Sequence, residues 1–183
     1  RDQCPRCSFC HLGHVVTHFQ HNNIIRYCQR PFRDMDHMRE MLIKNWNDTV
    51  SDVDTVFHLG DFAMGGNLEI VVPQILSRLN GFKVLIKGNH DHKVKTCGAK
   101  GWTSVHEIFN ITLESKEVIL QHRNPQDNLW PGNDKGVVLL HGHSHGGGHG
   151  YIDRINCIDV GVDCTNYRPV TMSYAISQAM LHP

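Results

Sequence analysis

The chain has 183 residues, of which 40% are hydrophobic and 20% are charged. A chain of this length and composition can bury most of its apolar surface, and we expect one globular domain over residues 1–183. Lysine plus arginine and aspartate plus glutamate both number 18, so the formal net charge is zero. This balance argues against strong bulk binding to nucleic acid or to a membrane surface.

No apolar stretch approaches the roughly 18 residues of a membrane span, and no secretory leader pattern precedes the first apolar segment. We therefore expect a cytoplasmic protein without a membrane partner. The seven cysteines are an odd number scattered along the chain, which argues against a secreted disulfide framework. The 15 histidines are unusual for this length, and metal ligation is the commonest reason for so much imidazole.

The N-terminal segment, residues 1–16, is atypical. Cys4, Cys7 and Cys10 have the two-residue spacing of a zinc knuckle, and His14 is a possible fourth ligand. The alternative is a reduced terminus that binds no metal. We favour this alternative because a closed zinc site takes its second ligand pair from a separate segment, and no further cysteine pair with this spacing follows.

Two helices are predicted in the first half of the chain, after a polar turn and a short apolar segment over residues 17–27. The first covers residues 34–47 and has apolar side chains at near-helical spacing, namely Met35, Met38, Leu42 and Trp46. We interpret these side chains as ordinary core residues. The second helix covers residues 67–80, with Gly81 at the position that ends a helix, while Pro73 leaves the position of its start open.

Three strand-like runs end in polar side chains that can bind metals. Residues 55–59 lead into Gly60-Asp61, residues 83–86 lead into Gly88-Asn89-His90-Asp91, and residues 137–140 lead into His141-Gly142-His143-Ser144-His145. In α/β proteins, binding and catalytic residues usually follow the C-terminal ends of strands, because the loops there do not contribute to the packed core. The three strand ends together predict one polynuclear metal site.

The second half of the chain continues with strands. Residues 108–113 and 118–121 predict two paired strands joined by a tight turn, and the second of them ends at His122. Residues 155–160 alternate in hydrophobicity as a strand does, and a helix is expected after Pro169.

Each of these motifs has an ordinary explanation when it is taken alone. Glycine, asparagine and aspartate favour turns for local reasons, and a lone histidine such as His122 is more often simply part-buried. A Gly/His stretch can also be an exposed loop. However, His143 and His145 lie two residues apart on an extended segment, so both imidazoles can face one metal cluster. The joint occurrence of the motifs, each after an apolar run, favours a metal centre.

The combined set resembles the calcineurin-like metallophosphoesterases. The shared motifs are Gly60-Asp61, Gly88-Asn89-His90-Asp91, His122 and Gly142-His143-Ser144-His145. Residues 23–32, 160–163 and 166–170 are similar to the small bacterial and phage members of that family. The resemblance extends from about residue 17 to the C-terminus.

The resemblance implies an α/β fold, a four-layer α/β/β/α sandwich of the metallophosphoesterase type, with a two-metal centre. Carried over position by position, Asp61 would bridge the metals, and the other ligands would be His18 and His145 at the first site and Asn89, His122 and His143 at the second. His90 resembles the family's catalytic histidine, whose imidazolium can stabilise phosphoryl charge and protonate the leaving oxygen. Mixed nitrogen and oxygen ligands imply two divalent transition-metal ions, manganese first, with iron, nickel or zinc as further candidates.

One position departs from the family pattern. The family's Asp-x-His aligns with Val16-Thr17-His18, so valine stands where a carboxylate is expected, and Gln20 replaces the usual glycine. The competing window Phe9-Cys10-His11 also lacks the carboxylate, and the stretch before these residues does not predict an apolar first strand. We therefore expect the first metal site to lack a negative ligand and to be only fractionally occupied.

The implied function is that of a metal-dependent phosphoesterase, which hydrolyses phosphate esters, phosphodiesters first, by a dinuclear metal-activated water. The alternative is a catalytically weakened or silent metal- or phosphate-binding member of the same fold. A third possibility is a zinc-binding module organised by Cys4, Cys7 and Cys10. The expected partner is a small phosphoester or nucleotide substrate, and the sequence specifies no oligomeric state.

Overall fold

The structure is a computed structural model that describes residues 12–93, 95–113, 115–123, 136–146 and 156–181. The strands are β1 (Leu12–Val15), β2 (Thr55–His58), β3 (Phe82–Ile86), β4 (Ser104–His106), β5 (Ile108–Leu113), β6 (Lys116–Gln121), β7 (Val138–His141), β8 (Cys157–Asp159) and β9 (Val170–Thr171). The helices are α1 (Asn22–Tyr27), α2 (Met35–Asn47), α3 (Leu68–Leu76) and α4 (Met172–Met180). None of these helices is long and apolar enough to cross a membrane.

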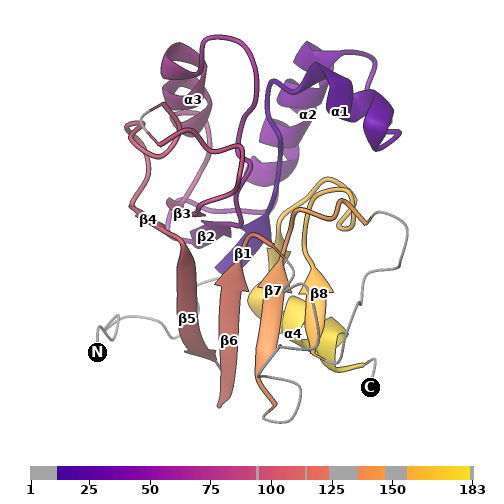
Figure 1. Cartoon of the computed structure of the whole chain (residues 1–183), viewed down its shortest axis with the longest axis vertical. Helices are drawn as coiled ribbons and strands as arrows, with labels where there is room; N and C mark the ends of the chain where they lie inside the picture. Colours follow the sequence, from indigo (N-terminus) through magenta and orange to yellow (C-terminus); the bar gives the residue numbers. More distant parts are fainter. Residues whose placement is uncertain (1–11, 94, 114, 124–135, 147–155, 182–183) are drawn as a thin grey trace.

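The strands form two sheets whose parallel strands end on the same side of the molecule. The first sheet has the order β4-β3-β2-β1-β9, in which β1 to β4 are parallel and β9 runs antiparallel to β1. The second has the order β5-β6-β7-β8, in which only β5 is antiparallel to its neighbour. In Figure 1 the arrowheads of β6, β7 and β8 point toward the end of the molecule that carries α1, α2 and α3.

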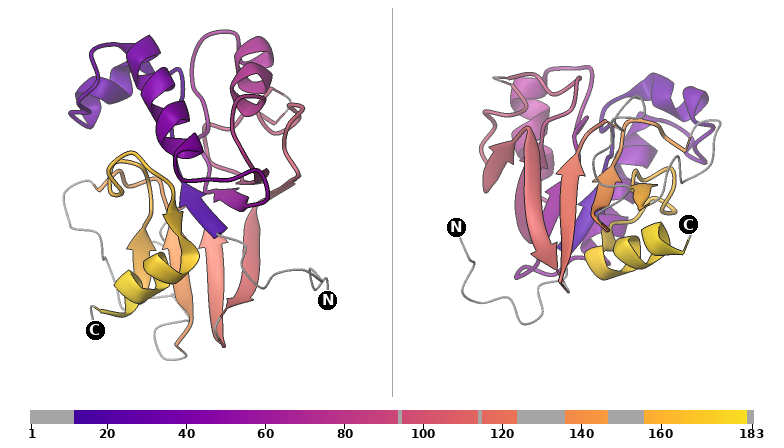
Figure 2. Two further views of the ribbon diagram at one scale, coloured as in Figure 1. Left: turned by 180° about the vertical axis from the view of Figure 1, so that it is seen from behind. Right: turned by 60° about the horizontal axis from the view of Figure 1, so that its bottom comes forward.

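The two sheets pack face to face, with α2 and α3 over the outer face of the first sheet and α4 packed against strands of both sheets. Successive side chains of β2 point to opposite faces of the first sheet. Val56 therefore joins the core beneath α2 and α3, and Phe57 joins the core between the sheets. Helix α4 contacts β1 and β9 of the first sheet and β7 and β8 of the second, and Figure 2 shows it in front of β7 and β8 in the view from behind. This confirms the predicted α/β/β/α sandwich.

The two predicted helices are present with adjusted ends. Helix α2 begins at Met35 because Asp34 caps it, accepting a hydrogen bond from the backbone N–H of His37 at 2.7 Å. Helix α3 ends at Leu76, earlier than expected, and contains Pro73 in its interior. After Leu76 the backbone bonds tighten to a three-residue spacing, as in Arg78 N to Ile75 O at 2.9 Å, so the residues up to Asn80 continue as turns.

The sequence did not predict every element, and β1 is the main correction. An apolar first strand was not expected, yet β1 is a central strand of the first sheet, in parallel register with β2 from Leu12 opposite Thr55. Helix α1 also replaces part of the expected apolar segment, and the short strands β4 and β9 were missed. Pairing on one or both edges decides such short strands more than their own residue preferences do.

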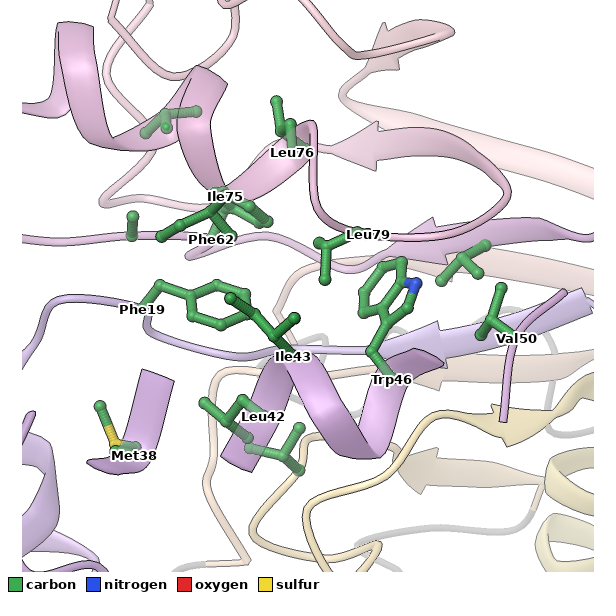
Figure 3. Close-up of a cluster of buried hydrophobic side chains, with 14 of the residues drawn as sticks. Phe19, Met38, Leu42, Ile43, Trp46, Val50, Phe62, Ile75, Leu76 and Leu79 are labelled. Carbon is green, nitrogen blue, oxygen red and sulfur yellow. The ribbon is translucent and has the colours of Figure 1, made fainter. Parts of the chain in front are cut away.

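The core beneath the helices is built around Trp46. The side chains that α2 and α3 turn toward each other meet over Phe19 and Phe62, whose ring centroids lie 5.1 Å apart (Figure 3). Trp46 is 1% exposed, and its indole N–H donates to the carbonyl of Asn80 at 3.1 Å. This cluster fixes both helices above the strand ends.

The Trp46→Ala variant should lower the free energy of unfolding by about 3–5 kcal/mol, because it leaves a large cavity and an unpaired Asn80 carbonyl. Urea denaturation followed by circular dichroism measures this change. The control is Val53→Ala, at a side chain that is 74% exposed, and it should change the free energy by about 0.5 kcal/mol or less. Equal losses in the two variants would contradict this account of the core.

Candidate metal centre

The predicted site residues follow the ends of four neighbouring strands. Asp61 follows β2, Asn89 follows β3, His122 follows β6 and His143 follows β7. Since β2 and β3 belong to one sheet and β6 and β7 to the other, the site lies where both sheets end. The sequence motifs that looked separate along the chain therefore meet in space.

Two glycines allow the strand ends to approach this closely. A Cβ atom on Gly60 would lie 2.6 Å from Gly88 Cα and 2.6 Å from His122 Nδ1. A Cβ atom on Gly88 would lie 2.3 Å from Asp61 Oδ1. Any larger residue would force the turn after β2 away from the turn after β3, so glycine is required at both positions.

Four ligand-capable atoms converge on a point beside His122. Its Nε2 lies 3.0 Å from Asn89 Oδ1, 3.1 Å from His143 Nδ1 and 3.3 Å from Asp61 Oδ2. Its Nδ1 lies 2.7 Å from the carbonyl oxygen of Leu59, which can only accept a hydrogen bond. In the neutral ring Nδ1 therefore carries the proton and Nε2 presents a lone pair, which is the tautomer that a metal ligand needs.

The two oxygens of Asp61 have different surroundings. Oδ1 accepts the backbone N–H of His90 at 2.8 Å, while Oδ2 lies 3.3 Å from His122 Nε2 and 3.6 Å from His18 Nε2. Burial alone would raise the pKa of this carboxyl, but its contact with His122 and the hydrogen bond from the His90 N–H hold it well below its ordinary value. Asp61 is therefore ionised, with one oxygen between two histidines.

His18 and His145 form a second group beside Asp61. Their ring centroids are 4.6 Å apart, and His18 is 2% exposed with no hydrogen-bond partner for either ring nitrogen among the described residues. Burial, together with repulsion from His145, lowers the pKa of His18 to about 2, so this ring is neutral. Burial would also lower the pKa of His145, but hydrogen bonds to Asp163 and Cys28 raise it to about 9.

His90 lies at the exposed edge of these groups. Its side chain is exposed, and its ring centroid lies 6.2 Å from that of His18 in an edge-on arrangement. The backbone N–H of His90, rather than its ring, contacts Asp61. The imidazole is thus free to meet a molecule that enters from solvent.

Comparison with known proteins agrees with this arrangement. A family model described as the calcineurin-like phosphoesterase superfamily domain matches residues 36–179. The uncharacterized protein MJ1445 of Methanocaldococcus jannaschii is 35% identical over 164 residues, which cover 87% of this chain and 85% of that protein. The chain belongs to the calcineurin-like phosphoesterase superfamily.

One solved structure in particular shows the same fold. The protein of unknown function AQ665 from Aquifex aeolicus has a TM-score of 0.73 at 24% identity, covering 91% of this chain and 98% of that one. An archaeal phosphodiesterase matches with a TM-score of 0.49 at 18% identity, covering 84% of each chain. The family resemblance and the fold class predicted from the sequence are both confirmed.

The donor atoms present here fit the divalent metals that calcineurin-like phosphoesterases generally use. Ligand atoms of Asp61, His122 and His143 lie within 4.8 Å of one another, and a second such group is formed by Cys28, His145 and Asp163. Lone pairs that face each other without a proton between them repel unless a cation is shared among them. The lone pair on Nε2 of a neutral His122 faces the ionised Asp61 in this way, so a cation between the two would relieve their repulsion.

The backbone at the predicted ligands is unusual. Four of them have positive φ angles, namely His18 at 57°, Asp61 at 53°, His143 at 69° and His145 at 52°. Residues other than glycine rarely adopt this left-handed conformation, and such residues gather at functional sites. Four of the ten non-glycine residues with positive φ in the described part of the chain are therefore predicted ligands.

Sequence reasoning missed the role of Asp91, although it lies in the strand-end motif. Its carboxylate accepts three backbone N–H groups, from Gly88 and Asp61 at 2.8 Å and from Phe62 at 2.9 Å. Asp91 is 4% exposed. This side chain ties together the turns after β2 and β3, which explains why an acidic residue ends the motif.

Arg30 and Asp163 were also missed as site residues, although both lie in runs that resemble the family. The Arg30 side chain is fully buried and binds both carboxylate oxygens of Asp163, at 2.7 and 2.8 Å. It also donates to the carbonyl of Thr17 at 2.9 Å. Asp163 Oδ2 in turn lies 2.8 Å from His145 Nδ1. The sequence did contain a signal for both residues, because Arg30 lies in residues 23–32 and Asp163 in residues 160–163, two segments that resemble the family.

The departure at Val16 is clear in the structure. The side chain is 1% exposed and belongs to the apolar core between the sheets. Its Cγ2 would lie 2.1 Å from a Cβ atom placed on Gly142, so the valine packs directly against the β7 turn. The cysteines proposed for a zinc knuckle, Cys4, Cys7 and Cys10, lie outside the described residues.

The Asp91→Asn variant should lower the free energy of unfolding by about 1–3 kcal/mol, because an amide cannot accept all three backbone N–H groups and leaves at least one without a partner. It should also weaken metal retention, because Asp61 loses its support. Thermal unfolding and metal analysis after dialysis measure both effects. The control is Asp52→Asn at an exposed position, and a similar loss there would contradict the role given to Asp91.

Proposed function

We propose that this chain, as one domain over residues 1–183, is a phosphoesterase that hydrolyses phosphate esters, phosphodiesters first, with two divalent transition-metal ions. The observation that carries the proposal is the position of Asp61 Oδ2, 3.3 Å from His122 Nε2 and 3.6 Å from His18 Nε2. A single ionised oxygen that faces two imidazole nitrogens is suited to serve two cations at once. Family membership supports the same chemistry.

The ligand roles follow the two groups of side chains. We assign Asn89, His122 and His143 to one metal, His18 and His145 to the other, and Asp61 to both. When bound, such a metal pair lowers the pKa of a water and neutralises charge on the phosphoryl oxygens. Manganese is the first candidate, and iron, nickel or zinc would also suit these ligands.

The remaining groups position the reactants. The Leu59 carbonyl fixes the His122 tautomer, and the His90 N–H fixes the Asp61 carboxylate, so neither must reorganise when substrate arrives. The exposed His90 imidazole can donate a hydrogen bond to a phosphoryl oxygen and pass its proton to the leaving oxygen. We expect a small phosphoester or nucleotide as the substrate. A cytoplasmic location stays a prediction.

A generic aryl phosphodiester tests this function. We expect hydrolysis that requires added Mn²⁺, stops with a chelator and is lost in Asp61→Asn, because that variant removes the negative charge that lies between the two groups. Release of the coloured phenol measures the rate. Turnover that is unaffected by chelation would contradict the proposal.

One observation favours the alternative of a weakened or silent metal- or phosphate-binding member. Val16 occupies the position where the family pattern has a carboxylate, and it is buried among apolar side chains. Mn²⁺ retention by the wild-type protein without turnover of any phosphoester in a small panel would favour this alternative over the enzyme.

His90→Ala should reduce turnover by roughly 10²–10⁴-fold, the range for a positioned acid, while metal content stays near that of the wild type. Parallel assays and elemental analysis measure the two quantities. His37→Ala, on helix α2, is the matched histidine control and should change neither. If His90→Ala instead strips the metal, the assignment of His90 as a non-ligand is wrong.

A further inference from the structure

The first metal position has a charge deficit. Its assigned ligands His18 and His145 are imidazoles, and the Asp61 carboxylate is shared with the other group. Val16 cannot supply the missing anion, because its side chain is packed into the core between the sheets. A cation held there therefore needs a negative ligand from another segment of the chain.

A thiol lies next to this position. Cys28 is the residue that ends helix α1, and its sulfur, a ring nitrogen of His145 and a carboxylate oxygen of Asp163 lie within 4.8 Å of one another. A sulfur and a nitrogen bound to one tetrahedral zinc lie roughly 3.6 Å apart, so the 4.8 Å limit on this group allows all three atoms to reach one ion. Cys28 is only part-buried, which leaves the thiol accessible to an ion from solvent.

An independent observation at His18 also indicates a ligand. This ring is 2% exposed, neither nitrogen has a hydrogen-bond partner among the described residues, and its centroid lies 4.6 Å from that of His145. A buried imidazole without partners loses the hydrogen bonds that it makes in water, at a cost in stability. A cation beside His145 would satisfy His18 as well.

Asp163 contributes geometry more than net charge. Its oxygens accept from Arg30 Nε at 2.7 Å, from Arg30 Nη2 at 2.8 Å and from His145 Nδ1 at 2.8 Å. An ionised carboxylate offers about four lone-pair sites, so one remains, and the bond to His145 is the one that a cation would replace. Because Arg30 already neutralises Asp163, the uncompensated negative charge has to come from the Cys28 thiolate.

We propose that Cys28 and Asp163 join His145 in binding the first metal ion, and that the Cys28 thiolate replaces the carboxylate missing at position 16. The inference deepens the proposed function and rests on it for its catalytic meaning. Binding releases the thiol proton and the His145 Nδ1 proton to solvent. At this position the added sulfur favours Zn²⁺, Co²⁺ or Fe²⁺ over Mn²⁺, whereas manganese stays the first candidate for the other ion.

Titration with Co²⁺ tests the thiolate directly, because cobalt bound to sulfur gives a charge-transfer band in the near ultraviolet. The protein should carry Cys4, Cys7 and Cys10→Ser, so that the N-terminal cysteines cannot contribute. We expect the band to saturate at one thiolate-bound cobalt per chain and to disappear in the additional variant Cys28→Ser. The matched control is Cys164→Ser, since this thiol packs against Gly146 near the same group, and it should keep the band.

Alkylation of the wild-type protein provides a second test, which does not depend on the folding of a variant. We expect Zn²⁺ to slow iodoacetamide labelling of Cys28 by roughly tenfold or more, because a metal-bound thiolate is not a free nucleophile. Mn²⁺ should leave the rate unchanged, and the part-buried Cys97 serves as the internal reference. Peptide mass spectrometry follows both cysteines.

The inference is overturned if the triple cysteine variant lacks the band, if Cys28→Ser retains it, or if Zn²⁺ protects Cys97 and Cys28 equally. Neither readout measures hydrolysis. Absence of phosphoesterase activity with an intact band would count against the proposed function alone, and activity without the band would count against this inference alone.

Discussion

The arrangement of the candidate metal centre depends on a buried carboxylate that is not among the proposed ligands. Asp91 accepts backbone N–H groups from both sides of the gap between the turns after β2 and β3. Gly60 and Gly88 let these turns approach, but a close approach without a tie would leave buried N–H groups unpaired. With Asp91 in place, Asp61 and Asn89 are delivered to the same point from different strands.

A second buried interaction fixes His18 and His145, the other group of proposed ligands. Arg30 is buried and joins Asp163 to the carbonyl of Thr17, the residue that precedes His18. Asp163 then contacts His145. A buried ion pair of this kind adds little net stability, because its desolvation offsets the attraction, but it fixes geometry well. The positions of His18 and His145 are therefore set by the same buried arginine.

The parts of the site that could be predicted from the sequence are those that form local motifs of neighbouring residues. His122, His143 and the motif that ends in Asp91 each follow an apolar run, and strand ends bring such residues together whatever the loop lengths are. The contact between Arg30 and Asp163 spans 133 positions and follows no local pattern. No spacing rule could have paired them, and the same holds for Cys28 with His145.

The fold was predictable to a similar degree, for the same reason. Helix α2 and strands β5 and β6 follow from hydrophobic periodicity and a turn between them, all local signals. Strand β1 is too short and too poor in apolar residues for such a signal. It exists because β2 and β9 offer it hydrogen bonds on both sides, and a single sequence does not reveal which neighbours a strand will have.

The left-handed backbone at the proposed ligands limits which amino acids can ever stand there. Aspartate, asparagine and histidine tolerate that conformation better than most residues do, and they are also the residues that bind hard and borderline cations. The turn geometry at Asp61, His143 and His145 thus preselects a small set of side chains, nearly all of them metal-competent. Alanine at these positions removes a proposed ligand and also adds backbone strain. Asparagine tolerates the left-handed conformation, so it is the replacement that changes the ligand without changing the backbone.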